Sequence, residues 1–335
     1  MDALKAEVSG GGYVEASKIT VRHYLVEIWL PAMTARVRPS THDTYVRLVN
    51  KHLVPELGDF RLQALDAAAV TQFVGRFSAA GLSPKSVRNV HAVLGKAMAD
   101  AVDLGSLRVN PAVKAKLPRL ERVQPRAWST AQLGQFLHLV DGNRLAPLWR
   151  FLVATGCRRG EGLGVRWPDV DLDSRLVRIA QQRVVVGGTV RTGAPKTNAG
   201  VRSLAIDGAT AAALRTWKTT QSTERLLMGA GWAETDGLVF THPDGTGLWP
   251  QTITARFKTI AEELGFQPIG LHGLRHSAAT FMIASGVSPK DRVPSGGGLS
   301  GVMPGVAQSP GVSSVAEVLS VSRVVSSSAN ELSVR

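Results

Sequence analysis

Three short stretches of this chain combine arginine, lysine and histidine in patterns that could act on a phosphate group. The first is the run TGCRRGE at residues 155–161, in which a helix is expected to end at the glycine. Arg158 then stands on the turn into the next helix, where a guanidinium fork and backbone N–H groups can hold two oxygens of an anion. Glu161 can anchor that turn. Taken alone, the run fits an ordinary arginine–glutamate structural pair at least as well as an anion site.

The second stretch is APKT at residues 194–197, which lies in a loop between two predicted strands. A lysine on such a hairpin can enter a groove of a polyanion and donate a proton to a leaving oxygen. Lys196 is the candidate for that role. Exposed hairpins commonly carry lysines, so this stretch indicates a function only in combination with the other two.

The third stretch is LHGLRH at residues 271–276. His272 and Arg275 are three residues apart at a predicted helix start, so both can face one spot. They would pair a permanent cation with a group that exchanges protons near neutral pH. His272 and His276 also have the i, i+4 spacing of a metal pair, but the carboxylate of a zinc-protease motif is missing, so no metal site is expected. Packing of a buried histidine is the remaining alternative.

Four amphipathic helices are predicted over residues 19–112, because apolar residues recur there at i, i+3 and i+4. The first is expected to stop at Pro31, the second to run from Pro39 to Pro55, the third to start at Asp66, and the fourth to start at Ser83-Pro84. Their apolar stripes leave basic residues facing outward, where two helices could meet phosphates together. A solvated charged face is the alternative. We favour DNA contact for Arg36, Arg38, Arg47, Lys51, Lys85, Arg88 and Lys96.

Residues 126–290 alternate helical patterns with short β-rich runs, which predicts a mixed α+β domain with a small antiparallel sheet. Strands are expected at 176–180, 183–186, 189–191, 201–206 and 238–241, and helices at 207–219, 221–229, 250–264 and 274–285. Residues 1–18 are expected to form a flexible arm and residues 113–125 a linker. Residues 291–335 contain no aromatic residue, lysine or histidine, and this composition predicts a disordered tail.

The composition limits the classes of molecule that the chain could bind. A formal net charge of +13 and a sequence pI near 10.4 favour polyanions. No apolar run approaches the roughly 18 residues of a membrane span, and the first residues lack the apolar core of a signal peptide. The single cysteine, Cys157, excludes an internal disulfide and a multi-cysteine zinc site. A reduced, cytoplasmic setting is expected.

Taken together, the three stretches resemble the tyrosine recombinase family, which includes the phage integrases. The resemblance covers residues 19–290, and its helical part is similar to that family's SAM-like core-binding domain. It implies that Arg158 and Arg275 clamp the scissile phosphate, that Lys196 protonates the leaving 5′-oxygen and that His272 assists proton transfer, with no cofactor. The pattern also includes Leu163, Val165, Arg166-Trp167, Asp169-Val170-Asp171, Arg202 to Ile206, Phe240 and Asp244-Gly245.

The family pattern continues beyond this point with a Leu-Gly-His turn and a tyrosine that attacks phosphorus to form a covalent 3′-phosphotyrosyl link. This chain agrees through residues 285–288 and then departs. Its only tyrosines are Tyr13, Tyr24 and Tyr45. The resemblance therefore implies a DNA strand-transferase for which this chain supplies no nucleophile. We predict salt-dependent binding to double-stranded DNA without strand cleavage, in a frameshifted or truncated integrase.

The sequence is also compatible with other functions. The chain could be a non-catalytic DNA-binding competitor, or it could accept a tyrosine from intact recombinase subunits in trans. Self-tetramers are not expected, because the C-terminal segment that family members exchange is missing. A metal nuclease is disfavoured by the lack of an acidic cluster, and a helix-turn-helix regulator would have no use for the set of arginines, lysine and histidine.

Overall fold

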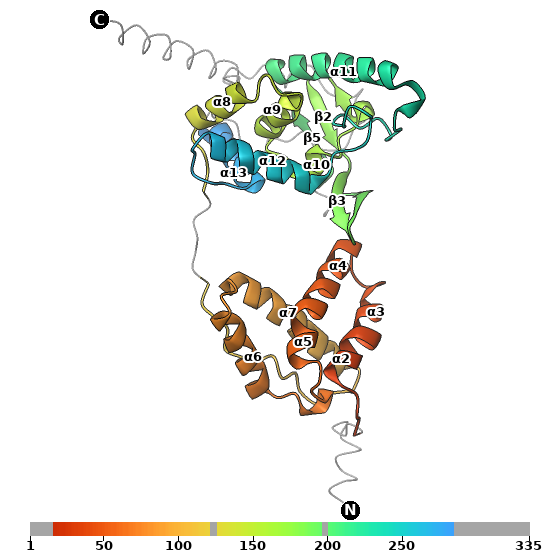
Figure 1. Cartoon of the computed structure of the whole chain (residues 1–335), viewed down its shortest axis with the longest axis vertical. Coiled ribbons are helices and arrows are strands. Elements are labelled where there is room, and N and C mark those ends of the chain that lie inside the picture. Colours follow the sequence, from red (N-terminus) through yellow and green to blue (C-terminus); the bar gives the residue numbers. More distant parts are fainter. Residues whose placement is uncertain (1–15, 121–125, 196–199, 285–335) are drawn as a thin grey trace, which may run out of the picture. The chain divides into compact units, whose positions relative to one another are not determined.

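The computed structural model describes residues 16–120, 126–195 and 200–284, and it divides the chain into two compact units at Val123 (Figure 1). Most of the predicted arm, Lys196 and the whole predicted tail at 291–335 lie outside the described residues. No described helix is both long and apolar enough to cross a membrane.

The first unit is helical, as the periodicity predicts. Two of its helices change from α to π geometry and back to α. The third begins at Asp66, whose side chain accepts a hydrogen bond from the Ala69 N–H, and the fourth is capped in the same way by Ser83. The elements are α2 (Val21–His23), η1 (Tyr24–Trp29), α3 (Leu30–Met33), α4 (Pro39–Leu48), η2 (Val49–Leu53), α5 (Val54–Leu57), η3 (Leu62–Ala64), α6 (Ala67–Ala79) and α7 (Pro84–Asp103).

The expectation that helices stop at Pro31 and Pro55 is wrong, because both helices run on for a further two residues. A proline lacks the N–H of a regular helix, and its ring collides with the carbonyl one turn earlier. In each case the turn just before the proline is widened into a π-helix, in which Leu30 donates to the Leu25 carbonyl and Val54 to the Val49 carbonyl. The wider turn relieves the collision, so the helix continues.

The core of the first unit encloses a buried polar group. Asp100 accepts hydrogen bonds from the Trp29 indole at 2.7 Å and from the Lys96 ammonium at 2.5 Å. Tyr24 is fully buried and donates to the Ala97 carbonyl at 2.9 Å, while Tyr45 stacks on Trp29 with 5.1 Å between ring centroids. Both described tyrosines are therefore packing residues of this unit.

The second unit contains a three-stranded antiparallel sheet in the order β1-β2-β5, a separate β3–β4 hairpin, and six α-helices among its described residues. In the sheet, Val170 pairs with Val177 and Leu176 with Ala205. The elements are α8 (Thr130–Leu139), α9 (Ala146–Thr155), α10 (Arg159–Gly162), η4 (Trp167–Asp169), β1 (Val170–Asp171), β2 (Leu176–Ile179), β3 (Gln182–Val186), β4 (Thr189–Gly193), β5 (Arg202–Ala205), α11 (Gly208–Met228), η6 (Gly229–Gly231), α12 (Pro250–Glu263) and α13 (Leu271–Ala284).

Two predicted boundaries in this unit differ. The helices expected at 207–219 and 221–229 are one helix, α11, because Gln221 faces the core rather than ending a turn. The strand expected at 238–241 forms only isolated bridges, from Leu238 to Arg166 and from Thr241 to Gly247.

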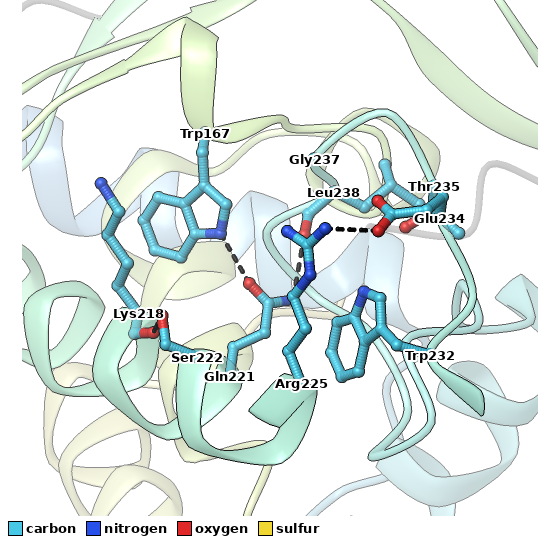
Figure 2. Close-up of a pocket in the computed structure, with 10 residues that line it drawn as sticks. All are labelled: Trp167, Lys218, Gln221, Ser222, Arg225, Trp232, Glu234, Thr235, Gly237 and Leu238. Carbon is cyan, nitrogen blue, oxygen red and sulfur yellow. Dashed lines mark hydrogen bonds and ion pairs between the residues drawn. The ribbon is translucent and has the colours of Figure 1, made fainter. Parts of the chain in front are cut away.

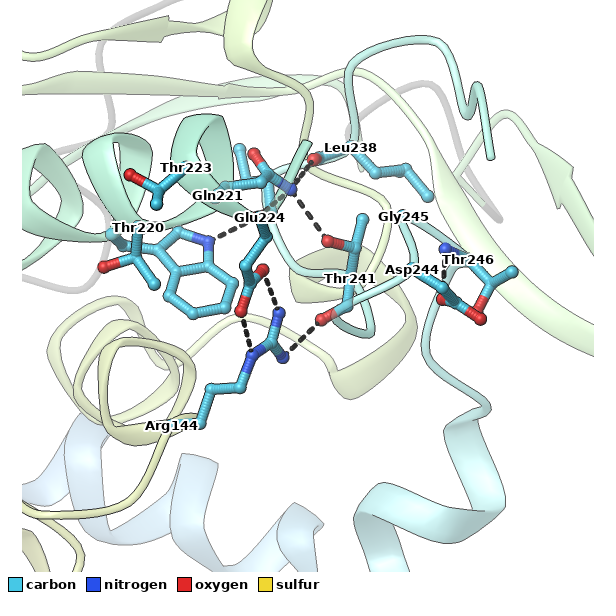
Figure 3. Close-up of polar contacts among 12 residues, drawn as sticks. Arg144, Thr220, Gln221, Thr223, Glu224, Leu238, Thr241, Asp244, Gly245 and Thr246 are labelled. Atoms are coloured by element: carbon cyan, nitrogen blue, oxygen red, sulfur yellow. Dashed lines mark hydrogen bonds and ion pairs between the residues drawn. The ribbon is translucent and has the colours of Figure 1, made fainter. Parts of the chain in front are cut away.

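A second polar network ties α11 to this irregular segment (Figure 3). The buried Gln221 amide donates to the Leu238 carbonyl at 3.1 Å and to the Thr241 hydroxyl at 2.8 Å. Arg144 holds Glu224 through two hydrogen bonds of 2.6 Å and also donates to the Thr241 carbonyl. These side-chain contacts replace the ladder that a regular strand would have formed.

An aromatic cluster forms the centre of the second unit and fixes α13. Trp128, Phe136, Trp149 and Phe257 contact one another with ring centroids 5.3 to 6.1 Å apart. The Trp128 backbone N–H donates to the Ser277 hydroxyl at 2.7 Å, and α13 packs against α9. This packing sets the position of the helix that carries two of the candidate site residues.

Candidate phosphate-binding site

The site is organised around a buried carboxylate, Glu161. Helix α9 ends at Gly156, whose φ of +54° reverses the chain, and Arg158 then caps α10. Glu161 accepts hydrogen bonds from the Arg158 backbone N–H at 2.9 Å, from the Arg158 guanidinium at 2.8 Å and from the Arg202 guanidinium at 2.7 Å. The Glu161 side chain is 1% exposed, whereas that of Arg158 is 55% exposed. Arg158 is thus held at one nitrogen and open to solvent over much of its fork.

Electrostatics keep Glu161 ionised in this position. Burial alone would raise the pKa of Glu161, but the hydrogen bonds from Arg202 and Arg158 outweigh burial and leave that pKa below its usual value. Arg202 is itself buried on β5. It was not among the predicted site residues, although an arginine between the apolar Val201 and Leu204 was a signal that it needed a buried partner.

Helix α13 brings His272 and Arg275 to the same place. The pKa of His272 is lowered by partial desolvation and then by electrostatic interaction with His276, Arg275 and Arg158. The rings of His272 and His276 meet edge to face, 4.8 Å between centroids. At neutral pH the lowered pKa favours an uncharged imidazole, which can accept as well as donate a proton. Arg158 and Arg275 thus both act electrostatically on His272, and the catalytic roles expected of these three residues stay predictions.

Gly273, between these residues, permits the close approach of α13. A β-carbon at this position would lie 2.8 Å from the Ile269 β-carbon and 3.1 Å from the Arg126 carbonyl oxygen. Any side chain there would push the start of α13 away from the rest of the unit. The glycine therefore supports the placement of His272 without contributing a group of its own.

The neighbouring Cys157 is not a reactive group. It is 3% exposed, and burial raises the pKa of its thiol to about 11. A thiol of that kind is protonated at neutral pH and is a poor nucleophile.

The remaining catalytic candidate, Lys196, lies outside the described residues. The chain that carries it joins the end of β4 at Gly193 to the start of β5 at Arg202. It thus follows the β3–β4 hairpin rather than forming its tip, which is Gly187-Gly188. Within the described part of the chain, no group of three or more histidine, cysteine or acidic side chains is arranged to hold a metal ion.

The seven basic residues proposed for the first unit fall into two groups. Two of them have structural partners: Lys96 pairs with Asp100, and the Arg88 guanidinium donates to the Pro118 carbonyl at 2.9 Å. The other five are exposed, and Arg38 among them also interacts with another group. They lie on the loop before α4, on α4 and η2, and at the start of α7: Arg36, Arg38, Arg47, Lys51 and Lys85.

Positive charge is concentrated where α4 meets η2. The pKa of His52 is lowered there, by burial first and then by Lys51 and Arg47. A polyanion bound at this surface would relieve that repulsion.

A pocket of about 220 Å³ lies elsewhere on the second unit (Figure 2). Two tryptophans, Trp167 and Trp232, line it, with Lys218 against the Trp167 ring and Arg225 paired to Glu234. None of its lining residues belongs to the arginine–histidine cluster described above. Arg158 and His272 of that cluster are exposed, so a large polyanion could reach them.

Comparison with known proteins agrees with this geometry. The pattern of the phage integrase family matches residues 129–291, and that of the phage integrase N-terminal SAM-like domain matches residues 23–78. The chain belongs to the phage integrase family. The family match ends at Asp291, close to the point where the sequence departs from the expected pattern.

Curated relatives of this integrase-family chain carry matching names. It is 26% identical over 265 residues to the ICEBs1 integrase of Bacillus subtilis (strain 168), covering 78% of this chain and 71% of the relative. It is 26% identical over 329 residues to an integrase of Saccharopolyspora erythraea, covering 81% and 75%. It is 29% identical over 242 residues to tyrosine recombinase XerC of Mycobacterium tuberculosis (strain ATCC 25177 / H37Ra), covering 67% and 72%.

Solved structures share the fold. The Tn1549 transposon integrase in complex with a circular intermediate DNA aligns with a TM-score of 0.69 at 19% identity, over 81% of this chain and 89% of that one. A lambda integrase dimer bound to a core site aligns with a TM-score of 0.61 at 15% identity, over 81% and 92%. The helical first unit and the mixed second unit are therefore the architecture of tyrosine recombinase integrases.

Proposed function

We propose that this chain is a tyrosine recombinase subunit that binds double-stranded DNA and holds a backbone phosphate without cutting it. The observation that carries the proposal is the cluster in which Glu161 positions Arg158 beside His272 and Arg275. The names of the relatives, integrase and tyrosine recombinase, and the DNA complexes of the structural neighbours support the same class of ligand. A DNA-associated, cytoplasmic location is part of this proposal.

Each side chain has a distinct part in holding the phosphate. Arg158 and Arg275 neutralise the non-bridging oxygens, and their charge would also stabilise the extra negative charge of a pentavalent phosphorane. Because Glu161 takes one Arg158 nitrogen, the side chain is oriented before DNA arrives. An uncharged His272 could exchange a proton with an attacking hydroxyl, and Lys196 with the leaving 5′-oxygen.

The proposed lack of cleavage rests on the tyrosines. Tyr24 donates to the Ala97 carbonyl in the core of the first unit, and burial raises the pKa of Tyr24 well above its ordinary value. Tyr45 is stacked on Trp29. The 44 residues that follow the family match contain no tyrosine at all. Without an attacking hydroxyl, charge stabilisation alone forms no covalent intermediate.

Reading the gene beyond the codon for Lys290 in all three frames, followed by assay of both chains, tests this proposal. If another frame continues with Leu-Gly-His and a tyrosine about thirty residues on, the chain joined to that frame is the matched control. Both proteins are then mixed with nicked duplexes carrying the element's own ends. The printed chain should retard the DNA without a covalent adduct on a denaturing gel. An adduct formed by the printed chain would refute the proposed defect, and failure to bind would refute the function.

A second candidate function is a subunit that receives a tyrosine from an intact recombinase. Retention of the ordered cluster of Arg158, His272 and Arg275 favours it, because a simple binding competitor would not need that cluster. To test this idea, the chain is mixed with an intact relative on a duplex that can be cleaved only at the half-site bound by this chain. Cleavage at that half-site, lost when this chain carries Arg158→Met, would support donation of a tyrosine in trans. If no cleavage occurs there, this second function is refuted and DNA binding is the function that remains.

A further inference from the structure

Two more arginines lie next to the phosphate-binding site and are not used by it. Arg159 is the first residue of α10, directly after Arg158, and Arg183 is on β3. Both are partly buried, and burial lowers the pKa of each. Arg158 and Arg202, in contrast, both pair with Glu161. Within the described residues, neither Arg159 nor Arg183 forms an ion pair with a carboxylate.

The Arg183 guanidinium is only partly hydrogen-bonded within the described residues. Its Nε and Nη1 atoms are buried and have no hydrogen-bond partner among the described residues. Its side chain lies over Gly247, where any β-carbon would collide with the guanidinium. A buried charged donor without an acceptor destabilises a protein unless a partner is supplied from outside.

The backbone of Arg183 is fixed against the helix that carries the other arginines. A β-carbon on Gly160 would lie 2.6 Å from the Arg183 carbonyl oxygen, so only glycine allows β3 to approach α10 this closely. The Arg159 guanidinium reaches to α12 and donates to the Thr254 hydroxyl, which itself donates to the Pro250 carbonyl at 3.1 Å. Arg159 and Arg183 therefore add positive charge between α10 and α12.

We infer that Arg183 and Arg159 form a second phosphate-binding surface, which neutralises DNA backbone phosphates adjacent to the one held by Arg158 and Arg275. The inference rests on the proposed function, because that function brings a phosphodiester chain to this face. Phosphate oxygens are the acceptors that match an unpaired guanidinium fork. The surface adds affinity and register on the duplex, and it takes no part in the chemical step.

The test compares Arg183→Met with the unchanged full chain. Methionine keeps an apolar stem of similar length and removes the buried donors. Binding to a fluorescein-labelled 30-base-pair duplex is measured by anisotropy at several salt concentrations. Loss of one phosphate contact should reduce the slope of log K against log salt by about 0.9, which corresponds to roughly five- to tenfold weaker binding near 0.1 M salt. The melting temperature without DNA should stay the same or rise.

Three further variants make the result specific. Gly247→Ala leaves Arg183 in the chain but displaces its guanidinium, so it should reproduce the loss in slope. Arg159→Met should also reduce the slope, since Thr254 keeps its bond to Pro250. Arg215→Met removes an exposed arginine that is already paired with Asp173, and it should leave the slope unchanged.

The outcomes separate this inference from the function on which it rests. If the unchanged chain does not bind the duplex, the proposed function fails and the second surface with it. If the unchanged chain binds and Arg183→Met binds with an unaltered slope, only the second surface is overturned. A lower melting temperature with an unaltered slope would identify Arg183 as a packing residue and would equally overturn it.

Discussion

Replacement of Glu161 by glutamine is the most direct probe of how the site is built. The carboxylate accepts from both Arg158 and Arg202, and a glutamine side chain offers only one acceptor oxygen in the same volume. At least one arginine bond must therefore be lost, and the amide N–H₂ group would face a cation. The change keeps the shape of the side chain and removes its charge.

The expected loss follows from burial. The Arg202 side chain is 6% exposed, so without its partner it becomes an uncompensated buried cation. Removing one partner of such a buried ion pair lowers the free energy of unfolding by about 3–5 kcal/mol. Arg158 is more than half exposed, and solvent screening makes its share of the loss small. We therefore expect Glu161→Gln to lower the free energy of unfolding of the second unit by about 3–5 kcal/mol at pH 7.

This loss should depend on pH with a definite sign. Because the pKa of Glu161 is lowered in the folded protein, its contribution is complete above the unfolded pKa of about 4.3 and disappears as pH falls through the folded value. The difference in stability between the unchanged chain and Glu161→Gln should therefore be constant near neutrality and shrink below about pH 4.

Urea unfolding followed by tryptophan fluorescence measures the effect, with Trp149 reporting on the core of the second unit. Asp173→Asn is the matched control, because it breaks an exposed ion pair with Arg215 and should cost at most about 1 kcal/mol. Replacing Arg202 by methionine in the Glu161→Gln background should recover part of the loss. A loss below about 1 kcal/mol for Glu161→Gln would refute the reasoning.

Three further results are expected from other parts of the structure. Tyr24→Phe should lower stability by about 1 kcal/mol, because it removes the hydrogen bond to Ala97, and should leave DNA affinity unchanged in the anisotropy assay; a selective loss of DNA binding would contradict a packing role. Cys157 should not react with a thiol reagent at pH 8 until the protein is unfolded, since its pKa is raised to about 11; rapid labelling of the native chain would contradict its burial. The His272 ring should titrate below pH 6.5 by NMR, and Arg158→Met should raise the pKa of His272 by removing a positive charge that acts on it. An unaltered titration would show that Arg158 does not influence His272.

Local sequence patterns were enough to find the elements and the motifs. The helices of the first unit follow from the spacing of their apolar residues, and the antiparallel strands from β-rich runs separated by Gly187-Gly188. The proximity of Arg158, His272 and Arg275 followed from a resemblance to a family whose site is assembled from distant segments. Periodicity alone could not have brought together residues more than a hundred positions apart.

Other features required the folded chain. Pro31 and Pro55 looked like helix ends, but a π turn before each proline lets the helix continue. Arg88 and Lys96 looked like free basic residues on an outward face. In the folded chain, Arg88 donates to a backbone carbonyl and Lys96 donates to the buried Asp100. Asp100 lies one turn further along α7, and the charge pattern did not single it out as a partner.

By itself, the sequence determined the family, the two-part organisation, the set of cationic residues and the absence of a tyrosine after Tyr45, since these depend on residue types and local spacing. Only the tertiary structure decided which cations are already neutralised. Glu161 and Arg202 are 41 residues apart in the chain and meet only in the folded chain, whereas the partly buried Arg183 packs against Gly247 with its Nε and Nη1 atoms unpartnered among the described residues. Pairing of charges depends on distances through space and on exclusion of water, and both of these are set by packing.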